Sequence, residues 1–193
     1  MNLKNKPKRS IYQPIMGIPV IILLLIIAAF GIQFSLKKHY PERYQKELDI
    51  IIKESGQSYR NKETGLEYYI LEDENKNKYI KIYGTNGKKQ IVKIPETING
   101  LPVTILGEMS FLYNEQVEEV ILPDSITAIT AFVFSDETKK LKKVTIPASV
   151  TDIDDLAFAN AANLCKQLTI VTDKGSAAEA YAKKHKIKVE YLP

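Results

Sequence analysis

The densest group of carboxylates in this sequence consists of Asp152, Asp154 and Asp155. Carboxylate oxygens are preferred ligands of Ca²⁺, and a calcium cage here would need further oxygens from an adjacent turn of chain. An earlier stretch that aligns with this one has no acid at the matching positions, which hold Ala128, Thr130 and Ala131. The ladder of acids needed for a cage between turns is therefore missing, and we expect no metal ion and no cofactor.

Residues suited to nucleophilic or acid–base catalysis are scarce. The chain has one cysteine, Cys165, and two histidines, His39 and His185, and we expect both histidines on the surface. The sequence lacks the G-x-S-x-G and H-E-x-x-H motifs, the P-loop and the dinucleotide-binding fingerprint. Since no set of residues satisfies the geometric roles that catalysis requires, we predict that the chain is not an enzyme.

Two stretches of the chain carry the same pattern, ILPDSITAITAFVF at residues 121–134 and TIPASVTDIDDLAF at residues 145–158. They align without a gap, and Pro123 and Pro147 are 24 positions apart. A fixed period of about 20 to 50 residues is typical of a solenoid, whose units cannot bury their apolar faces alone. The first unit is five residues longer, near INGLP (residues 98–102). Four similar strand endings indicate about three turns and a terminal strand: VKIP (92–95), VILP (120–123), VTIP (144–147) and LTIV (168–171).

The repeat also predicts the environment of the single cysteine. Cys165 follows Phe158 by seven positions, as Leu141 follows Phe134. Cys165 therefore corresponds to a core leucine, and we expect it to be a small buried apolar residue without a role as nucleophile or ligand. One cysteine cannot form an internal disulfide, so the domain must depend on its packed core.

Both ends of the repeat array differ from its middle. LEYYIL and YIKIY, residues 66–71 and 79–83, alternate as strands do, and TNGK at residues 85–88 contains the tight-turn signal Asn-Gly. We expect an antiparallel cap here that covers the first strand edge. At the other end, Ser176 caps a predicted helix that reaches about Lys184 and precedes the alternating strand IKVEY. This second element is the expected closing lid.

These segments resemble the BspA-type leucine-rich repeats of bacterial surface proteins. The segments concerned are IPETINGLPVTILGEMSF, LPDSITAITAFVF, IPASVTDIDDLAF and GSAAEAYAKKHKIKVEYL, and the resemblance covers residues 66–193. It implies a short right-handed leucine-rich-repeat solenoid, β-rich and α+β, with a short parallel sheet along one side, an antiparallel β N-cap and a helix–strand C-cap. It also implies binding or adhesion in place of catalysis. The array is shorter than those of the large adhesins in the family, which argues against adhesion over a broad surface.

A long apolar run without charged residues, GIPVIILLLIIAAFGIQF, occupies residues 17–34. At about 1.5 Å per helical residue, a run of about 20 residues spans a bilayer core of roughly 30 Å. We predict a transmembrane helix over Ile15–Phe34, within a signal anchor at residues 11–36. The alternative is a cleaved signal peptide and a secreted protein, with Ala29–Gly31 as the small-residue cleavage site.

Charge around this run predicts its orientation. The run is preceded by four basic residues and no acid: Lys4, Lys6, Lys8 and Arg9. By the positive-inside rule, residues 1–10 form a cytoplasmic tail and the bulk of the chain is outside the cell. Residues 37–65 are the expected juxtamembrane region, with a helix over residues 40–56 and a polar linker over residues 57–65. Residues 66–193 form the predicted leucine-rich-repeat domain with its caps.

The charge balance bears on possible partners. Of 27 basic residues, four lie in the tail, so 23 basic residues face 23 acidic residues in the remainder. Binding to a phosphate backbone requires a basic footprint, so we expect no nucleic-acid partner. The expected partners are a protein or glycan outside the cell, or a membrane or envelope protein.

The predicted outward side of the parallel sheet is the candidate binding face. Its side chains between the buried pairs are Lys93, Ile121, Thr145 and Thr169, flanked by Ile91, Glu119, Lys143 and Gln167. With strands about 4.8 Å apart, these positions form two ladders. The alternative is an ordinary solvated surface. We predict a membrane-anchored extracytoplasmic binding module without catalysis, or, as the alternative, a structural or assembly component of a cell-envelope complex.

Overall fold

The computed structural model describes residues 58–85, 88–112, 114–134, 138–158 and 167–193. The chain divides into two units, Met1–Lys62 and Glu63–Pro193. The transmembrane helix predicted over Ile15–Phe34 and the helix predicted over residues 40–56 lie outside the described residues, as do His39 and Cys165.

No helix in the described part of the chain is long and apolar enough to cross a membrane. In the first unit, the described residues include the short strand β1 (Ser58–Arg60). This strand lies within residues 57–65, whose role as a linker stays a prediction.

The second unit begins with an antiparallel hairpin of β2 (Glu67–Glu72) and β3 (Lys78–Gly84), which confirms the predicted cap. Its turn is organised by Asp73. The Asp73 Oδ1 atom accepts hydrogen bonds from the backbone N–H groups of Asn75 and Asn77, both at 2.8 Å. Hydrogen bonds from Asn77 lower the pKa of Asp73, so the carboxylate stays ionised and continues to hold the turn.

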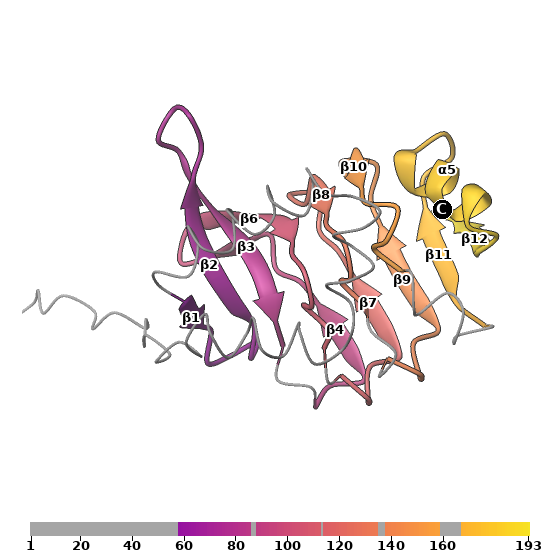
Figure 1. Cartoon of the computed structure of the whole chain (residues 1–193), viewed down its shortest axis with the longest axis horizontal. Helices are drawn as coiled ribbons and strands as arrows, with labels where there is room; N and C mark the ends of the chain where they lie inside the picture. Colours follow the sequence, from indigo (N-terminus) through magenta and orange to yellow (C-terminus); the bar gives the residue numbers. More distant parts are fainter. Residues whose placement is uncertain (1–57, 86–87, 113, 135–137, 159–166) are drawn as a thin grey trace, which may run out of the picture. The chain divides into compact units, whose positions relative to one another are not determined.

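Two sheets build the rest of this unit (Figure 1). The first has the order β2-β3-β6-β8-β10, parallel from β3 onward, with β6 (Leu101–Leu106), β8 (Ala128–Ile129) and β10 (Asp152–Ile153). The second is parallel throughout, in the order β12-β11-β9-β7-β4. Its strands are β4 (Ile91–Lys93), β7 (Glu119–Ile121), β9 (Lys143–Ile146), β11 (Thr169–Thr172) and β12 (Lys188–Tyr191).

The chain passes from one sheet to the other in each turn, so the unit is a β-solenoid of about three turns. The resemblance predicts one parallel sheet along one side, which is the second sheet, and the structure adds the first sheet, with its parallel strands β6, β8 and β10. Its strands β8 and β10 have only two residues each, too few to show an alternating pattern in the sequence.

The expected insertion in the first turn forms a second hairpin. Strand β5 (Thr97–Ile98) pairs antiparallel with β6, and the two residues between them, Asn99 and Gly100, have φ values of 53° and 80°. Positive φ at both central residues is what a tight type I′ hairpin turn requires, and Asn-Gly is the sequence that best adopts it. The insertion is therefore accommodated in a tight hairpin, and β6 still pairs parallel with β3, with one register irregularity between Ile80 and Lys81.

A charged pair lies where β3 meets the end of β6. Lys81 is only 3% exposed, and its Nζ atom lies 2.8 Å from Glu108 Oε2. Gly107 leaves room for this lysine, since a Cβ there would come within 2.6 Å of Lys81 Cε and of the Ile82 carbonyl oxygen. Glycine is required by this close approach, and the ion pair compensates for burying the ammonium group.

The core follows from side-chain alternation along the second sheet. Val120, Val144 and Ile170 occupy one ladder and are 0% exposed. Leu122 follows Val120 by two residues, Ile146 follows Val144 by two residues, and both are also buried. This confirms the prediction that each strand has apolar side chains two apart on its inner side.

One aromatic ring per turn forms a continuous stack in the core. Phe134 lies between Phe111 and Phe158, with ring centroids 4.9 Å and 4.7 Å apart. The next ring is Tyr181 of the helix, at 5.7 Å from Phe158. Fully buried aromatic side chains contribute large apolar area, and stacked pairs add about 0.5–1.5 kcal/mol each.

Tyr181 also ends the hydrogen-bond pattern of the turns. In the preceding turns, the amide of the stacked phenylalanine donates to a carbonyl oxygen of the next turn: Phe111 N to Val133 O (3.1 Å) and Phe134 N to Ala157 O (3.3 Å). The amide of Phe158 donates to the Tyr181 hydroxyl oxygen (3.3 Å), and that hydroxyl donates to the Asp155 carbonyl oxygen (3.3 Å). The Tyr181 hydroxyl group thus supplies the acceptor for Phe158 N that a backbone carbonyl of a further turn would supply.

Helix α5 (Ala177–Lys184) and β12 close the unit, as predicted for the lid. Ser176 is the N-cap, and its Oγ atom accepts a hydrogen bond from Glu179 N at 3.1 Å. The Glu179 carboxylate accepts hydrogen bonds from Gly175 N and, at 2.6 Å, from the Tyr191 hydroxyl group of β12. Glu179 therefore ties the start of the helix to the last strand.

The substitution Tyr181→Phe keeps the ring but removes the hydroxyl group. We expect it to lower the free energy of unfolding by about 1–3 kcal/mol, because the buried Phe158 amide loses its acceptor. Urea denaturation of the full chain in mild detergent, followed by circular dichroism, measures this loss. An unchanged midpoint would show that the hydroxyl does not terminate the stack.

The difference in unfolding free energy between the parent and Tyr181→Phe should depend on pH. Burial raises the pKa of Tyr181 to about 12 from its ordinary value of 10.0. Because the pKa of Tyr181 is higher in the folded than in the unfolded chain, the folded state holds the hydroxyl proton more tightly. The resulting stabilisation of the fold is fully present below pH 10 and is lost as the pH rises from 10 to 12. We expect the difference in unfolding free energy between parent and Tyr181→Phe to shrink across this range. A constant difference would contradict the assignment.

Candidate functional site

The outward side of the second sheet carries two ladders of side chains, which we call the outward face. The parallel register places one residue of each strand in each ladder. The first ladder contains Ile91, Glu119, Lys143, Thr169 and Lys188. The second contains Lys93, Ile121, Thr145, Val171 and Glu190.

The last turn differs from the register that the sequence predicts. Thr169 pairs with Lys143, whereas the predicted ladders align Thr169 with Thr145 and Gln167 with Lys143. That alignment is wrong by two residues: Val171 lies beside Thr145, and Gln167 is an exposed residue before β11. A shift of two leaves every side chain on its own side of the sheet, so alternation alone cannot detect it.

The outward face mixes apolar and charged side chains of differing exposure. Ile91 is 52% exposed, Lys93 and Lys188 are also exposed, and Ile121, Glu119, Lys143, Thr145, Val171 and Glu190 are half-buried. Thr169 is 5% exposed and offers little surface to a ligand. The structure thus brings six of the seven predicted binding residues onto this face, with Gln167 outside it.

Charges concentrate at the end of the face formed by β12. Glu190 lies 2.8 Å from Lys188 and 3.5 Å from Lys143, measured between carboxylate oxygen and Nζ. The hydrogen bond from Lys188, followed by the charges of Lys188 and Lys143, lowers the pKa of Glu190. These pairs are exposed and contribute little to stability, but they keep the glutamate ionised.

A second row of polar contacts borders the face, just before β7 and β9. The Lys142 Nζ atom lies 2.6 Å from Glu118 Oε2, and its hydrogen bond is the main cause of a lowered pKa at Glu118. Two residues earlier in each of the same turns, Lys140 Nζ donates a hydrogen bond to Gln116 Oε1 at 2.7 Å. The repeat therefore aligns polar groups between turns along the border as well as on the face.

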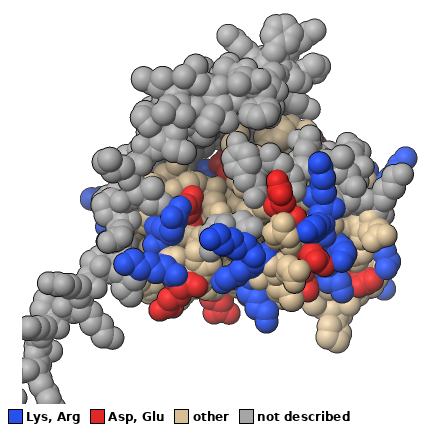
Figure 2. Space-filling view, turned by 90° about the horizontal axis from the view of Figure 1, so that it is seen from below, with Lys and Arg blue, Asp and Glu red and all other residues tan. Residues whose placement is uncertain are grey.

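Figure 2 shows how charges are distributed over one side of the molecule. Lys and Arg side chains intermingle with Asp and Glu side chains, with uncharged residues between them. Such a surface changes sign over short distances.

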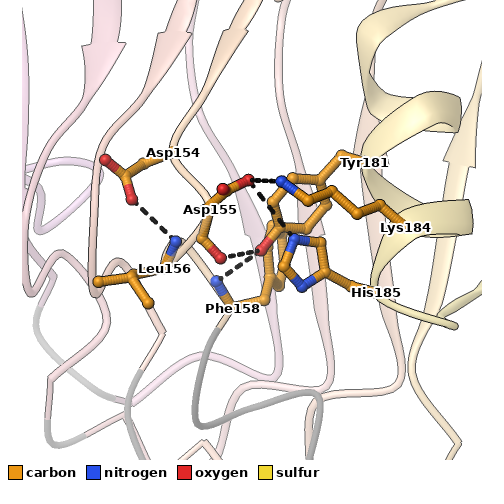
Figure 3. A network of polar contacts seen from close by, with 7 residues as sticks. All are labelled: Asp154, Asp155, Leu156, Phe158, Tyr181, Lys184 and His185. Atoms are coloured by element: carbon orange, nitrogen blue, oxygen red, sulfur yellow. Dashed lines mark hydrogen bonds and ion pairs between the residues drawn. The ribbon is translucent and has the colours of Figure 1, made fainter.

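Two of the three clustered carboxylates found in the sequence, Asp154 and Asp155, make the polar contacts drawn in Figure 3. Asp154 is 6% exposed, and its Oδ1 atom accepts a hydrogen bond from Leu156 N at 2.8 Å. Asp155 accepts one from Lys184 Nζ at 2.6 Å, while Asp152 is exposed on β10. Within the described residues, no group of three or more potential metal ligands is found.

Asp155 holds the closing helix against the last complete turn. Its pKa is lowered mainly by the hydrogen bond from Lys184, with a smaller contribution from His185, whose Nε2 lies 3.7 Å away. The His185 ring stacks on Tyr181 with centroids 4.2 Å apart and its side chain is 27% exposed, so it is half-buried instead of lying on the surface. Figure 3 shows Tyr181 and Lys184 of α5, and the C-cap residue His185, reaching toward Asp155.

The repeat geometry agrees with a family match. The profile of the BspA type leucine rich repeat region matches residues 71–171 in six copies. This chain belongs to the BspA-type leucine-rich repeat family. Leucine-rich repeats serve as protein-interaction modules, BspA-type proteins are typically found at the cell surface, and repeat proteins of this kind are typically not catalytic.

Two solved structures are similar to this BspA-type chain. One is a leucine rich cell surface protein from Faecalibacterium prausnitzii A2-165, with 22% identity and a TM-score of 0.47, covering 64% of this chain and 38% of that chain. The other is a leucine rich repeat protein of T. pallidum, with 18% identity and a TM-score of 0.36, covering 58% of this chain and 71% of that chain. No curated protein matches the sequence.

Sequence reasoning missed the part of the face that the lid supplies. Lys188 and Glu190 of β12 extend the two ladders, and Val171 stands where Thr169 was expected. The alternation Lys-Val-Glu in residues 188–190 was a usable signal, because it predicts two outward charges around one inward apolar residue. The BspA-type face therefore continues through the terminal strand.

Glu179 supplies a test of how the terminal strand is held. Hydrogen bonds from Lys183, Tyr191 and Gly175 lower the pKa of Glu179 to about 2 from 4.5. Because the pKa of Glu179 is lower in the folded than in the unfolded chain, the ionised carboxylate stabilises the fold above pH 4.5. This stabilisation is lost as the pH falls from 4.5 to 2. We expect Glu179→Gln to be less stable than the parent at neutral pH, with the difference disappearing toward pH 2.

Thermal unfolding of parent and variant across this pH range measures the effect. Glu115→Gln is the matched control, since it removes one negative charge from an exposed residue. Parallel curves for parent and Glu179→Gln would contradict the assigned role.

Proposed function

We propose that this chain is a membrane-anchored, extracytoplasmic, non-catalytic binding module that recognises a protein or glycan outside the cell through its outward face. The observation that carries the proposal is the continuity of that face across the parallel strands. Partly exposed apolar side chains such as Ile91 and Ile121 alternate there with charges such as Lys93 and Glu119. Repeat proteins commonly bind through such extended surfaces.

The composition of the face favours contact with another macromolecule over capture of a small molecule. Interface centres combine apolar side chains with a polar rim, and Ile121, Thr145 and Val171 have this central position between charged neighbours. The face is built from short, hydrogen-bonded strands, so binding would cost little backbone ordering.

Membrane anchoring through residues 11–36, with residues 1–10 in the cytoplasm, is the second part of the proposal. It is supported by the apolar run at residues 17–34 and by the basic tail before it. The typical location of BspA-type proteins at the cell surface is consistent with this orientation.

The alternative function is a structural or assembly component of a cell-envelope complex. It is favoured by the short array and by the apolar stripe in residues 40–56, which could pair with a membrane partner. Under this alternative, the partner belongs to the cell that makes the chain, and contact is not confined to the outward face.

Site-specific photo-crosslinking in the producing cells separates these functions. A photoreactive amino acid replaces Thr145 on the outward face or, as the matched control, Ala128 on the other sheet, since both are half-buried strand positions. We expect adducts from position 145 and few from position 128. Equal adducts at both positions would contradict binding through the outward face, and a stoichiometric envelope partner captured at position 128 would favour the assembly function.

Cysteine accessibility tests the anchoring. In a Cys165→Ala background, a membrane-impermeant maleimide added to intact cells should label Asp124→Cys, at an exposed residue of the repeat unit, and leave Asn2→Cys unlabelled. Labelling of Asp124→Cys only after lysis would contradict an extracytoplasmic repeat domain. Loss of the Asn2 region from the mature chain would show cleavage.

A further inference from the structure

Strand β12 is the last strand of the second sheet, and no other strand among the described residues pairs with its outer edge. Val189 is half-buried, although Val120, Val144 and Ile170 in the same ladder are 0% exposed. The neighbouring Tyr191 is 50% exposed, and the following Leu192 is 37% exposed. Apolar side chains therefore remain accessible at this end of the core.

Strand β12 carries opposite charges placed symmetrically about a valine. Lys188 and Glu190 point outward on either side of Val189. If two copies of β12 paired antiparallel with Val189 opposite Val189, each Lys188 would lie opposite Glu190 of the other copy. Directly opposed pairs of opposite charge stabilise antiparallel strands by about 0.2–1 kcal/mol each.

The charges also select against other registers. Centring the pair on Lys188 would place two ammonium groups opposite each other, and centring it on Glu190 would oppose two carboxylates, both of which are unfavourable. The other edge strand, β4, lacks this symmetry, because pairing centred on Val92 would place Ile91 opposite Lys93. Edge charges often prevent pairing, but here they permit one register.

We propose that β12 is a homotypic docking strand, which pairs antiparallel with β12 of a second copy and joins two second sheets edge to edge. On the inner side, Val189 would meet its equivalent, and Tyr191 would gain cover from Ile187 of the second copy. The two outward faces would become continuous, so the dimer would present doubled, bivalent binding surface. This association does not depend on the identity of the ligand.

Mixing two charge variants tests the register directly. Full-length chains carrying different affinity tags are prepared in mild detergent as parent, Lys188→Glu and Glu190→Lys. Each variant alone opposes like charges in its homodimer, so we expect co-purification of tagged copies to fall by about tenfold or more. In the mixture, the introduced glutamate of one variant lies opposite the introduced lysine of the other, and the unchanged Glu190 lies opposite the unchanged Lys188. Every opposed pair then has opposite charges, so co-purification should return to the parent level.

A cysteine at the centre of the pair provides an independent readout. In the Cys165→Ala background, Val189→Cys should form a disulfide-linked dimer on mild oxidation, because the Cα atoms of directly opposite residues are about 4.5–5.5 Å apart, within the range that a disulfide bridges. The control is Val92→Cys, which is buried at the centre of the other edge strand, β4, and should remain monomeric.

Three results would overturn the proposal. One is co-purification of the single variants at the parent level, and another is failure of the mixture to restore association while each variant keeps the parent's thermal unfolding midpoint. The third is equal crosslinking of Val189→Cys and Val92→Cys, which would indicate association without the β12 register.

Discussion

The repeat unit depends on the backbone hydrogen bonds that fix each turn against the next. These bonds recur at equivalent points, with Thr127 N donating to Thr104 O at 2.9 Å and Thr151 N donating to Thr127 O at 3.1 Å. Because the register recurs, one aromatic ring per turn falls at the same depth of the core, and the outward side chains fall into ladders. One constraint therefore produces both the packed interior and the surface available for binding.

A stack held in this way must be closed at both ends, and the two ends are closed differently. The β2–β3 hairpin covers the first end with antiparallel pairing. At the last turn, Tyr181 supplies both the final ring and the missing hydrogen-bond groups, and Asp155 holds the helix through Lys184. The closure is complete over the aromatic stack but not at the edge strand β12, where Val189 remains half-buried. This difference links the architecture to the proposed association of two copies.

Much of this fold follows from sequence patterns that have a physical cause. The period between Pro123 and Pro147 predicts the turns, and Ser176 marks the start of the closing helix. The last register was wrong because a shift of two residues preserves alternation, so Thr169 fits either ladder. The contact between Asp155 and Lys184 joins residues far apart in the sequence, and no local pattern encodes it. The outward face was largely predictable, whereas its ligand depends on surface chemistry that the repeat leaves free to vary.

A double-mutant cycle between Phe134 and Phe158 tests most directly whether the turns act as one stacked unit. The free energy of unfolding is measured for the parent, for Phe134→Leu, for Phe158→Leu and for the double variant. If the ring stack couples adjacent turns, the two losses will depart from additivity by about 0.5 kcal/mol or more, as expected for residues in contact. Additivity within about 0.3 kcal/mol would contradict the account, because it would mean that each turn is stabilised independently of the ring in the next.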